Sequence, residues 1–191
     1  MAKQKIITLG LDLSLTGTGV IILENGKIIK RILIKSKPVG DLPIDELKRI
    51  QKIVSDIENT FQDKNGTGPY INVAVIEGLA FMVRNATALV QLSALNYMTR
   101  ALLKDHGIPF VIVAPTSLKK FVTGSGASKK DVMLMETFKR YNVSILNDNE
   151  CDAFGLAKIG EALLMTSGPR CSLPIFQQEV LDLLDKQIKN I

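Results

Sequence analysis

The stretch of sequence that decides the fold is IITLGLDLSLTGTGV, residues 6–20. Its apolar half, Ile6–Leu13, is typical of a strand buried on both faces, and such a strand has no structural reason to carry a carboxylate. Asp12 nevertheless lies at its end, directly before a turn rich in Ser, Thr and Gly. The folded chain must therefore solvate this acid, pair it or bind a metal ion with it.

Composition restricts the class of protein. The 191 residues can form one sizeable core, and a hydrophobic fraction of 46% with a charged fraction of 23% is typical of a globular domain. The net charge of +5 favours a polyanionic partner such as nucleic acid. Cys151 and Cys171 are too far apart for a zinc site and too few for a disulfide framework, so we expect free thiols. No apolar run is long enough for a signal segment or a bilayer span, which indicates a cytoplasmic, nucleoid-associated protein, or one in the host cytoplasm if viral.

Hydrophobic periodicity predicts an α/β fold, a mixed five-stranded sheet flanked by helices. Asn25-Gly26 is a strong hairpin signal, so the sheet opens with an antiparallel meander, and helical crossovers then lead to parallel strands. Ser128 and Asn147 are the expected N-caps of two late helices. We expect strands at Ile6–Leu13, Val20–Leu23, Lys27–Ile34, Val73–Ile76 and Pro109–Val113, and helices at Ile44–Phe61, Asn85–Lys104, Ser117–Val122, Lys129–Tyr141, Cys151–Met165 and Phe176–Lys189.

Two further acids occupy positions that the fold can bring close to Asp12. Glu77 follows a short apolar strand, and Asp152 lies in the first turn or so of a late helix. The C-terminal ends of parallel neighbouring strands meet at one edge of the sheet. Three carboxylates with a single histidine in the chain, His106, select a hard divalent cation such as Mg²⁺ or Mn²⁺. Such a site supports phosphoryl transfer.

Taken singly, each acid also has an ordinary explanation. Glu77 could be a solvated strand-end acid, and Asp152 could interact only with the helix dipole. Asp12 is harder to explain in this way because its strand is so apolar. We therefore favour a joint site of the three acids over three coincidences.

Basic and aromatic residues suggest how a nucleic acid could bind. Lys119-Lys120 and Lys129-Lys130 flank a Gly/Ser turn, TGSGA, and together could clamp phosphates. Phe81 could stack on an unpaired base, with Arg84 and Asn85 contacting phosphate or sugar. A solvated surface is the ordinary explanation for the lysines, and core packing for Phe81. The segments GTG (residues 17–19) and GSGASKK (residues 124–130) match neither the dinucleotide fingerprint nor the P-loop spacing.

With these motifs in place, residues 6–163 resemble the RuvC family of Holliday junction resolvases, endonucleases of the ribonuclease H-like fold. LGLDLSLTGTGVI is similar to the family's first motif, VAVIEGLAFMVRNATALVQLS to its second, APTSLKKFVTGSGASKKDVM to its basic segment and NECDAFGLA to its last. The resemblance implies that Asp12, Glu77 and Asp152 are metal ligands. It also implies that Phe81 acts as a wedge near the strand-exchange point, one residue later than expected.

One departure from the family lies next to the last acid. The family has Asp or His three residues before that Asp, where this chain has Asn149. Asp148 or Glu150 could supply the fourth ligand, or Asn149 could do so through its carbonyl; we favour Glu150 slightly over Asp148. Lys119 and Lys130 best match the family's functional lysines.

The resulting hypothesis is a crossover junction endodeoxyribonuclease that uses Mg²⁺, with Mn²⁺ as a substitute and two ions per site, to nick opposite strands of a four-way DNA junction. The resemblance implies a homodimer formed through the helix at 85–104, with residues 1–165 as the nuclease domain and residues 166–191 appended to it. One alternative is a non-catalytic or broader branched-DNA binding protein that recognises flaps or forks. Another is a small ATP-binding kinase-like domain, for which 191 residues leave no room for the usual second copy.

Overall fold

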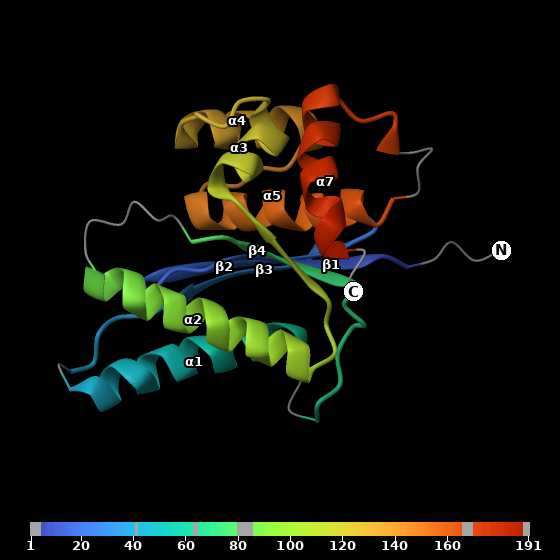
Figure 1. The fold of residues 1–191 in the computed structure, drawn as a ribbon. Coiled ribbons are helices and arrows are strands. Elements are labelled where there is room, and N and C mark those ends of the chain that lie inside the picture. The colour runs from blue at the N-terminus through green and yellow to red at the C-terminus, as the bar shows by residue number, and fades with distance from the viewer. Residues whose placement is uncertain (1–4, 41, 63–64, 80–85, 166–169, 189–191) are drawn as a thin grey trace.

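The computed structural model describes residues 5–40, 42–62, 65–79, 86–165 and 170–188. The described residues form a five-stranded sheet in the order β3-β2-β1-β4-β5, with β1 in the middle (Figure 1). β1 pairs with β2 and β2 with β3 in antiparallel fashion, whereas β1–β4 and β4–β5 are parallel. The predicted meander followed by parallel strands is confirmed. The strands are β1 (Ile7–Asp12), β2 (Gly17–Glu24), β3 (Lys27–Lys35), β4 (Val73–Glu77) and β5 (Phe110–Val113).

Helices cover both faces of the sheet (Figure 1). α1 (Pro43–Phe61) and α2 (Ala86–Asp105) lie on one face; α3 (Pro115–Thr123), α4 (Lys130–Tyr141), α5 (Asp148–Leu163) and α7 (Ile175–Ile188) lie on the other. Each face has its own hydrophobic core. Leu9 and Leu11 of β1 belong to the core under α1 and α2, whereas Val73 and Val75 of β4 belong to the core under α5.

Alternation along β1 sets the direction of Asp12. Successive side chains of a strand point to opposite faces, so Thr8, Gly10 and Asp12 face away from the core that holds Leu9 and Leu11. They face α5 instead, and the Thr8 hydroxyl donates a hydrogen bond to the carbonyl oxygen of Ala157 at 3.0 Å. The acid therefore lies on the α5 side of the sheet.

Three elements begin two or three residues earlier than predicted, for reasons that side-chain periodicity does not reveal. β2 begins at Gly17 because backbone pairing continues as far as Gly19 opposite Asp12 and Gly17 opposite Lys35. α3 begins at Pro115, a residue that is well suited to the first helical position. The predicted cap Asn147 is confirmed, since its side chain accepts from the Glu150 N–H, but α5 begins at once at Asp148.

The predicted cap Ser128 is wrong. The N-cap of α4 is Lys129, which makes no side-chain capping bond to any described residue. The Ser128 hydroxyl lies 2.7 Å from that of Thr123 instead. Closure of the Gly/Ser turn thus takes the hydroxyl that the helix would have used.

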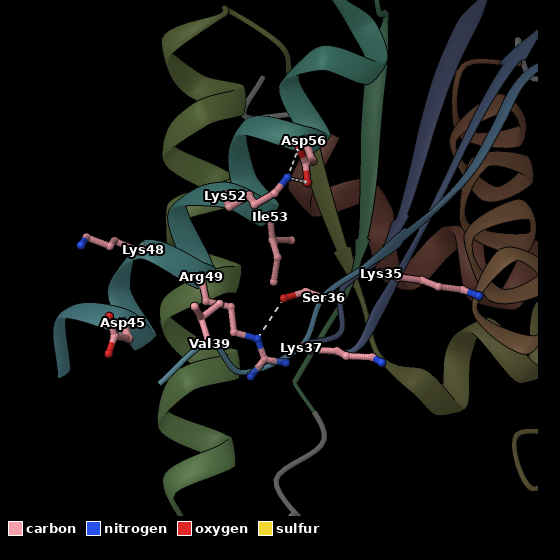
Figure 2. Close-up of a pocket in the computed structure, with 10 residues that line it drawn as sticks. All are labelled: Lys35, Ser36, Lys37, Val39, Asp45, Lys48, Arg49, Lys52, Ile53 and Asp56. Atoms are coloured by element: carbon pink, nitrogen blue, oxygen red, sulfur yellow. Dashed lines mark hydrogen bonds and ion pairs between the residues drawn. The ribbon is translucent and has the colours of Figure 1, made fainter. Parts of the chain in front are cut away.

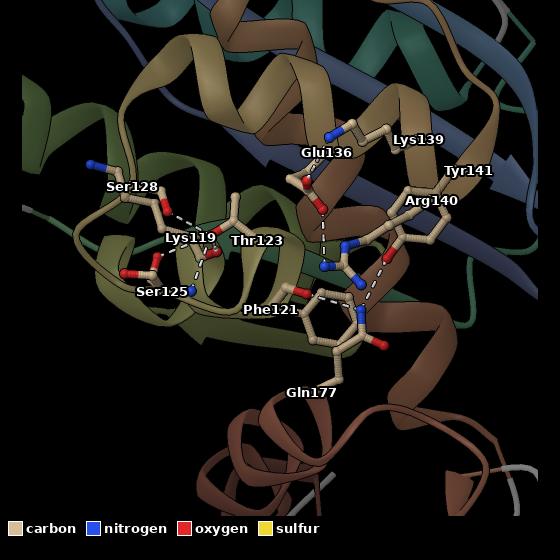
Figure 3. Close-up of polar contacts among 10 residues, drawn as sticks. All are labelled: Lys119, Phe121, Thr123, Ser125, Ser128, Glu136, Lys139, Arg140, Tyr141 and Gln177. Atoms are coloured by element: carbon tan, nitrogen blue, oxygen red, sulfur yellow. Dashed lines mark hydrogen bonds and ion pairs between the residues drawn. The ribbon is translucent and has the colours of Figure 1, made fainter.

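The C-terminal helix α7 packs into the core under α5 through Val180, Leu181 and Leu184. The buried Gln177 amide donates to the Phe121 carbonyl at 2.9 Å and lies 3.2 Å from the Tyr141 hydroxyl (Figure 3). Within the described residues, no helix has the length and apolarity needed to cross a membrane.

Candidate active site

Asp12 ends β1 with its side chain in the interface between the sheet and α5, and only 7% of its surface is exposed. Two residues of a strand span about 6.8 Å, close to one turn of a helix. Every second residue of β1 can therefore contact every fourth residue of α5. Thr8 contacts Ala157, and Gly10 contacts Ala153. One step further along, Asp12 reaches the first turns of α5, where Asp152 lies.

Glycines allow α5 to approach this closely. A Cβ atom on Gly10 would lie 1.9 Å from the carbonyl oxygen of Ala153, and one on Gly19 would lie 2.1 Å from that of Asn149. Both collisions are with backbone, so no side chain could move to relieve them. The Asn149 side-chain amide also donates to the Gly17 carbonyl at 2.6 Å. These contacts place the N-terminus of α5 directly on β1 and β2.

Burial and mutual repulsion alter the ionisation of the three acids. Burial, and then the charges of Glu77 and Asp152, raise the pKa of Asp12 to about 8. Burial and the Asp152 charge raise the pKa of Glu77 to about 7. Burial raises the pKa of Asp152 to about 6, although Lys130 opposes the shift. The structure therefore brings the three predicted acids within electrostatic reach of one another.

A hydrogen bond joins the side chains of Asp12 and Glu77; it raises the pKa of Asp12 and lowers that of Glu77. Two carboxyl groups can share such a bond only if one of them carries a proton, and these shifts leave the proton on Asp12. As the side chains stand, no three or more His, Cys, Asp or Glu residues of the described chain form a group that could hold a metal ion. The donor chemistry still fits a hard divalent cation, because all three groups are carboxylates.

The residues before Asp152 have separate partners. Asp148 pairs with Lys130 at 2.9 Å, and its charge helps to raise the pKa of Asp152. The Glu150 carboxylate lies 3.5 Å from Arg31 of β3. Asp148 therefore interacts electrostatically with Asp152, whereas Glu150 faces the edge of the sheet. The role of Glu150 as a ligand stays a prediction.

Two of the four predicted lysines lie at the acids. The charge of Lys119 lowers the pKa of Glu77 and Asp152, and the charge of Lys130 lowers that of Asp12 and Asp152. Lys120 instead forms an ion pair with Glu179 of α7 at 2.6 Å. Lys129 is exposed at the start of α4. Each Lys-Lys pair of the sequence therefore has one member at the acids, Lys119 or Lys130, and one member away from them, Lys120 or Lys129.

The turn between α3 and α4 is organised around Thr123. Its hydroxyl lies 2.8 Å from the Lys119 carbonyl, 3.1 Å from the Ser125 carbonyl and 2.7 Å from the Ser128 hydroxyl (Figure 3). These contacts tie the end of the helix that carries Lys119 to the start of the helix that carries Lys130. The TGSGA turn therefore has a defined hydrogen-bonded geometry.

Phe81, Arg84 and Asn85, the predicted base- and phosphate-contacting residues, lie outside the described residues. Cys151 is buried and free, and burial raises the pKa of its thiol to about 11. This supports the interpretation of Cys151 as a packing residue rather than a nucleophile.

Two residues near the site were not predicted. The Asn96 amide of α2 is buried and donates to the Glu77 carbonyl at 3.4 Å. Arg49 of α1 donates to the Leu15 carbonyl, in the turn that follows Asp12, and to the Ser36 hydroxyl at 2.9 Å. Asn96 had a signal in the sequence, an amide within an apolar helix. Arg49 had none, because it belongs to the mixed-charge residues of its helix.

Solved structures with a similar arrangement include those of Holliday junction resolvases. T. thermophilus RuvC in complex with a Holliday junction substrate superposes with a TM-score of 0.63 at 13% identity, over 80% of this chain and 90% of that one. The chain therefore has the RuvC fold. A second Thermus thermophilus RuvC structure gives 0.61 at 15% identity, over 80% and 91% of the two chains. The yeast mitochondrial Holliday junction resolvase Ydc2 gives 0.55 at 12% identity, over 96% and 83%.

These likenesses confirm the ribonuclease H-like fold that the resemblance to the RuvC family implied. No protein-family model and no curated protein matches the sequence. With identities this low, the RuvC fold is what the comparisons establish, and activity has to be argued from the residues of the site.

Proposed function

We propose that this protein is a metal-dependent, structure-selective endonuclease that resolves four-way DNA junctions by paired nicks in opposite strands. One observation carries the proposal: on a RuvC fold, three acids with raised pKa values lie within electrostatic reach of one another and of Lys119 and Lys130. Buried carboxylates that repel one another are costly unless a cation binds them. The lysines on either side suit the phosphate that such a cation would contact.

Asp12, Glu77 and Asp152 would hold Mg²⁺, or Mn²⁺ in its place, with two ions in each site and Asp148 or Glu150 completing the ligands. A bound metal would activate a water molecule for attack and stabilise the negative charge on the phosphoryl and leaving oxygens. The residues of the chain do the rest. Asp12 releases its proton to Glu77 or to solvent so that the acids can act as ligands, and Lys119 and Lys130 orient the phosphate.

Branched DNA is the proposed partner. The net charge of +5 supports it, and of the solved structures with this fold one was obtained with a Holliday junction. The proposed assembly is a homodimer, which would place two sites on one junction. Exposed apolar residues on α2 support this proposal, since Val90 and Tyr97 are each 65% exposed.

A nicking assay tests the function. The protein is incubated with Mg²⁺ and end-labelled four-way, three-way, flap and linear duplex DNA of equal arm sequence. We expect paired nicks in the four-way junction and loss of cutting with EDTA. Equal cutting of all four substrates would refute structure selectivity, and absence of cutting with either Mg²⁺ or Mn²⁺ would refute the nuclease.

A non-catalytic junction-binding protein is the second candidate. Its support is that the Asn149 amide is used to hold α5 on β2 and that Glu150 pairs with Arg31. This candidate predicts tight junction binding without any nick. Titration calorimetry with Mg²⁺ separates the two candidates independently of cutting, because only the nuclease requires an ion whose binding is lost in Asp12→Asn.

A further inference from the structure

A second basic surface lies apart from the acids, between the end of β3 and the first half of α1. We name it the β3–α1 groove; it is a pocket of about 340 Å³ (Figure 2). Apolar side chains of Val39 and Ile53 line part of it. Its basic lining residues are Lys35, Lys37, Lys48, Arg49 and Lys52.

The charges of this groove are largely uncompensated. Among the described residues, two carboxylates line it, Asp45 and Asp56, and Asp56 already pairs with Lys52 at 2.7 Å. Lys35, Lys37 and Lys48 are exposed and form no ion pair with a carboxylate of the described chain. Figure 2 shows the ammonium groups of Lys35, Lys37 and Lys48 pointing away from Ile53, so the surface around the groove carries the excess of positive charge that suits an anion.

The groove lies at the same edge of the sheet as the acids. Lys35 ends β3 opposite Gly17, and Gly19 lies opposite Asp12, so the strand order puts Lys35 two strands from Asp12. Neighbouring strands are about 4.8 Å apart, which gives about 10 Å across the sheet.

Contacts connect the groove with the site and extend it away from the site. Arg49 lines the groove and donates to the Leu15 carbonyl in the turn that follows Asp12. A second hollow of about 330 Å³ shares Val39, Asp45 and Arg49 with the groove and continues to Thr87 and Gln91 of α2, but Asp45 and Glu46 line it, so it adds no positive charge. The lysines of the groove itself lie on both sides of it, Lys48 on one side and Lys35 and Lys37 on the other (Figure 2). Such a spread of charges fits a chain of phosphates better than a single small anion.

We propose that the β3–α1 groove binds the phosphate backbone of a DNA arm that leads away from the bond that is nicked. This inference rests on the proposed function, which brings DNA to the acids. It adds Lys37 and Lys48 as DNA-binding residues on the side of the sheet opposite Lys119 and Lys130.

Junction binding by Lys37→Ala/Lys48→Ala tests the proposal. Fluorescence anisotropy with a labelled four-way junction in EDTA measures affinity without cutting, at several salt concentrations. We expect about a 10-fold loss of affinity near 0.1 M salt and a salt slope smaller by about 2, because two phosphate contacts are removed. The matched control is Lys27→Ala/Lys104→Ala, which removes the same charge from exposed lysines at the opposite end of β3 and of α2. We expect less than a 2-fold change for it.

The arginine pair Lys37→Arg/Lys48→Arg retains the charges and should retain the affinity, and melting curves of all variants should coincide with that of the wild type. Equal affinities and salt slopes for the two alanine pairs would overturn the groove and leave the nuclease proposal intact. A wild-type protein that binds the junction but never nicks it would refute the nuclease, while the groove test keeps its readout. A wild-type protein that binds no junction would overturn both.

Discussion

On the sheet face that α1 and α2 cover, apolar side chains such as Leu9, Ile53 and Leu95 fill the space between strand and helix. On the other face α5 lies backbone to backbone against β1 and β2, because Gly10 and Gly19 leave no side chain between them. The first arrangement tolerates small movements of a helix, since side chains can repack. The second fixes the helix to within a fraction of an ångström, and it is the one that holds Asp152 near Asp12.

The largest expected effect comes from replacing one acid on the α5 face. Asp12→Asn should lower the nicking rate at least about 1,000-fold, because a metal ligand is lost. It should not lower the free energy of unfolding, since the amide can donate to Glu77 in place of the protonated Asp12 carboxyl. Leu95→Ala on the other face should leave the nicking rate of the folded protein unchanged and lower the free energy of unfolding by about 2–5 kcal/mol. Nicking of labelled junctions and urea unfolding measure both. An Asp12→Asn protein that cuts at the wild-type rate would exclude the acids as the site.

The backbone contact itself is tested by Gly10→Ala. The new Cβ would meet the Ala153 carbonyl, so α5 has to move away, at a cost of about 3 kcal/mol. Gly160→Ala at the far end of the same helix meets side chains and no backbone, with Val75 at 3.0 Å and Val73 at 3.2 Å, and these have to shift by only a few tenths of an ångström. We expect it to change stability by less than about 1 kcal/mol. Thermal unfolding and nicking of both variants provide the comparison, and equal losses would show that the close approach is not special.

Ionisation distinguishes the two faces further. The pKa of Asp12 is raised to about 8, so the folded state binds a proton that the unfolded state has released above pH 4. The stabilisation is complete below about pH 4 and is lost as the pH rises through 8, at up to about 1.4 kcal/mol per pH unit for one proton. Urea unfolding in EDTA between pH 5 and 8 should therefore show falling stability. The slope of the unfolding free energy against pH should become shallower in Asp12→Asn and stay unchanged in Leu95→Ala. Equal slopes for the wild type and both variants would contradict the raised pKa of Asp12.

Sequence reasoning located Asp12, Glu77 and Asp152 because an acid after a buried strand, or in the first turns of a helix, is visible as a pattern of residue types. It also predicted an antiparallel meander followed by parallel strands, since a hairpin signal and helical crossovers are local features of the sequence. It did not identify why GTG follows Asp12. Gly19 is required by a carbonyl oxygen of Asn149, which lies 130 residues away in the chain. Contacts of that kind follow only from the packed backbone.

The fourth metal ligand and the functional lysines also could not be selected from the sequence alone. Lys119 and Lys120 are adjacent in the sequence, yet one faces the acids and the other pairs with Glu179 of α7. Glu150 and Asp148 likewise have partners on different elements, Arg31 of β3 and Lys130 of α4. Charge runs predict that a surface is basic or acidic, but the helix rotation that selects one residue depends on the packing of the core.

The smallest expected effect concerns the helix ends. Asn147 caps α5 by accepting from the Glu150 N–H, so Asn147→Ala should cost about 1 kcal/mol. The matching position before α1 is Leu42, 64% exposed and without a side-chain cap to any described residue, and Leu42→Asn should add about 0.5–1 kcal/mol. Loss of the α5 cap should also lower the nicking rate, because the first turn positions Asp152, whereas a new α1 cap should leave it unchanged. If Asn147→Ala loses stability and cuts normally, the first turn of α5 is held by the Gly10 and Gly19 contacts alone, and the cap serves only the helix.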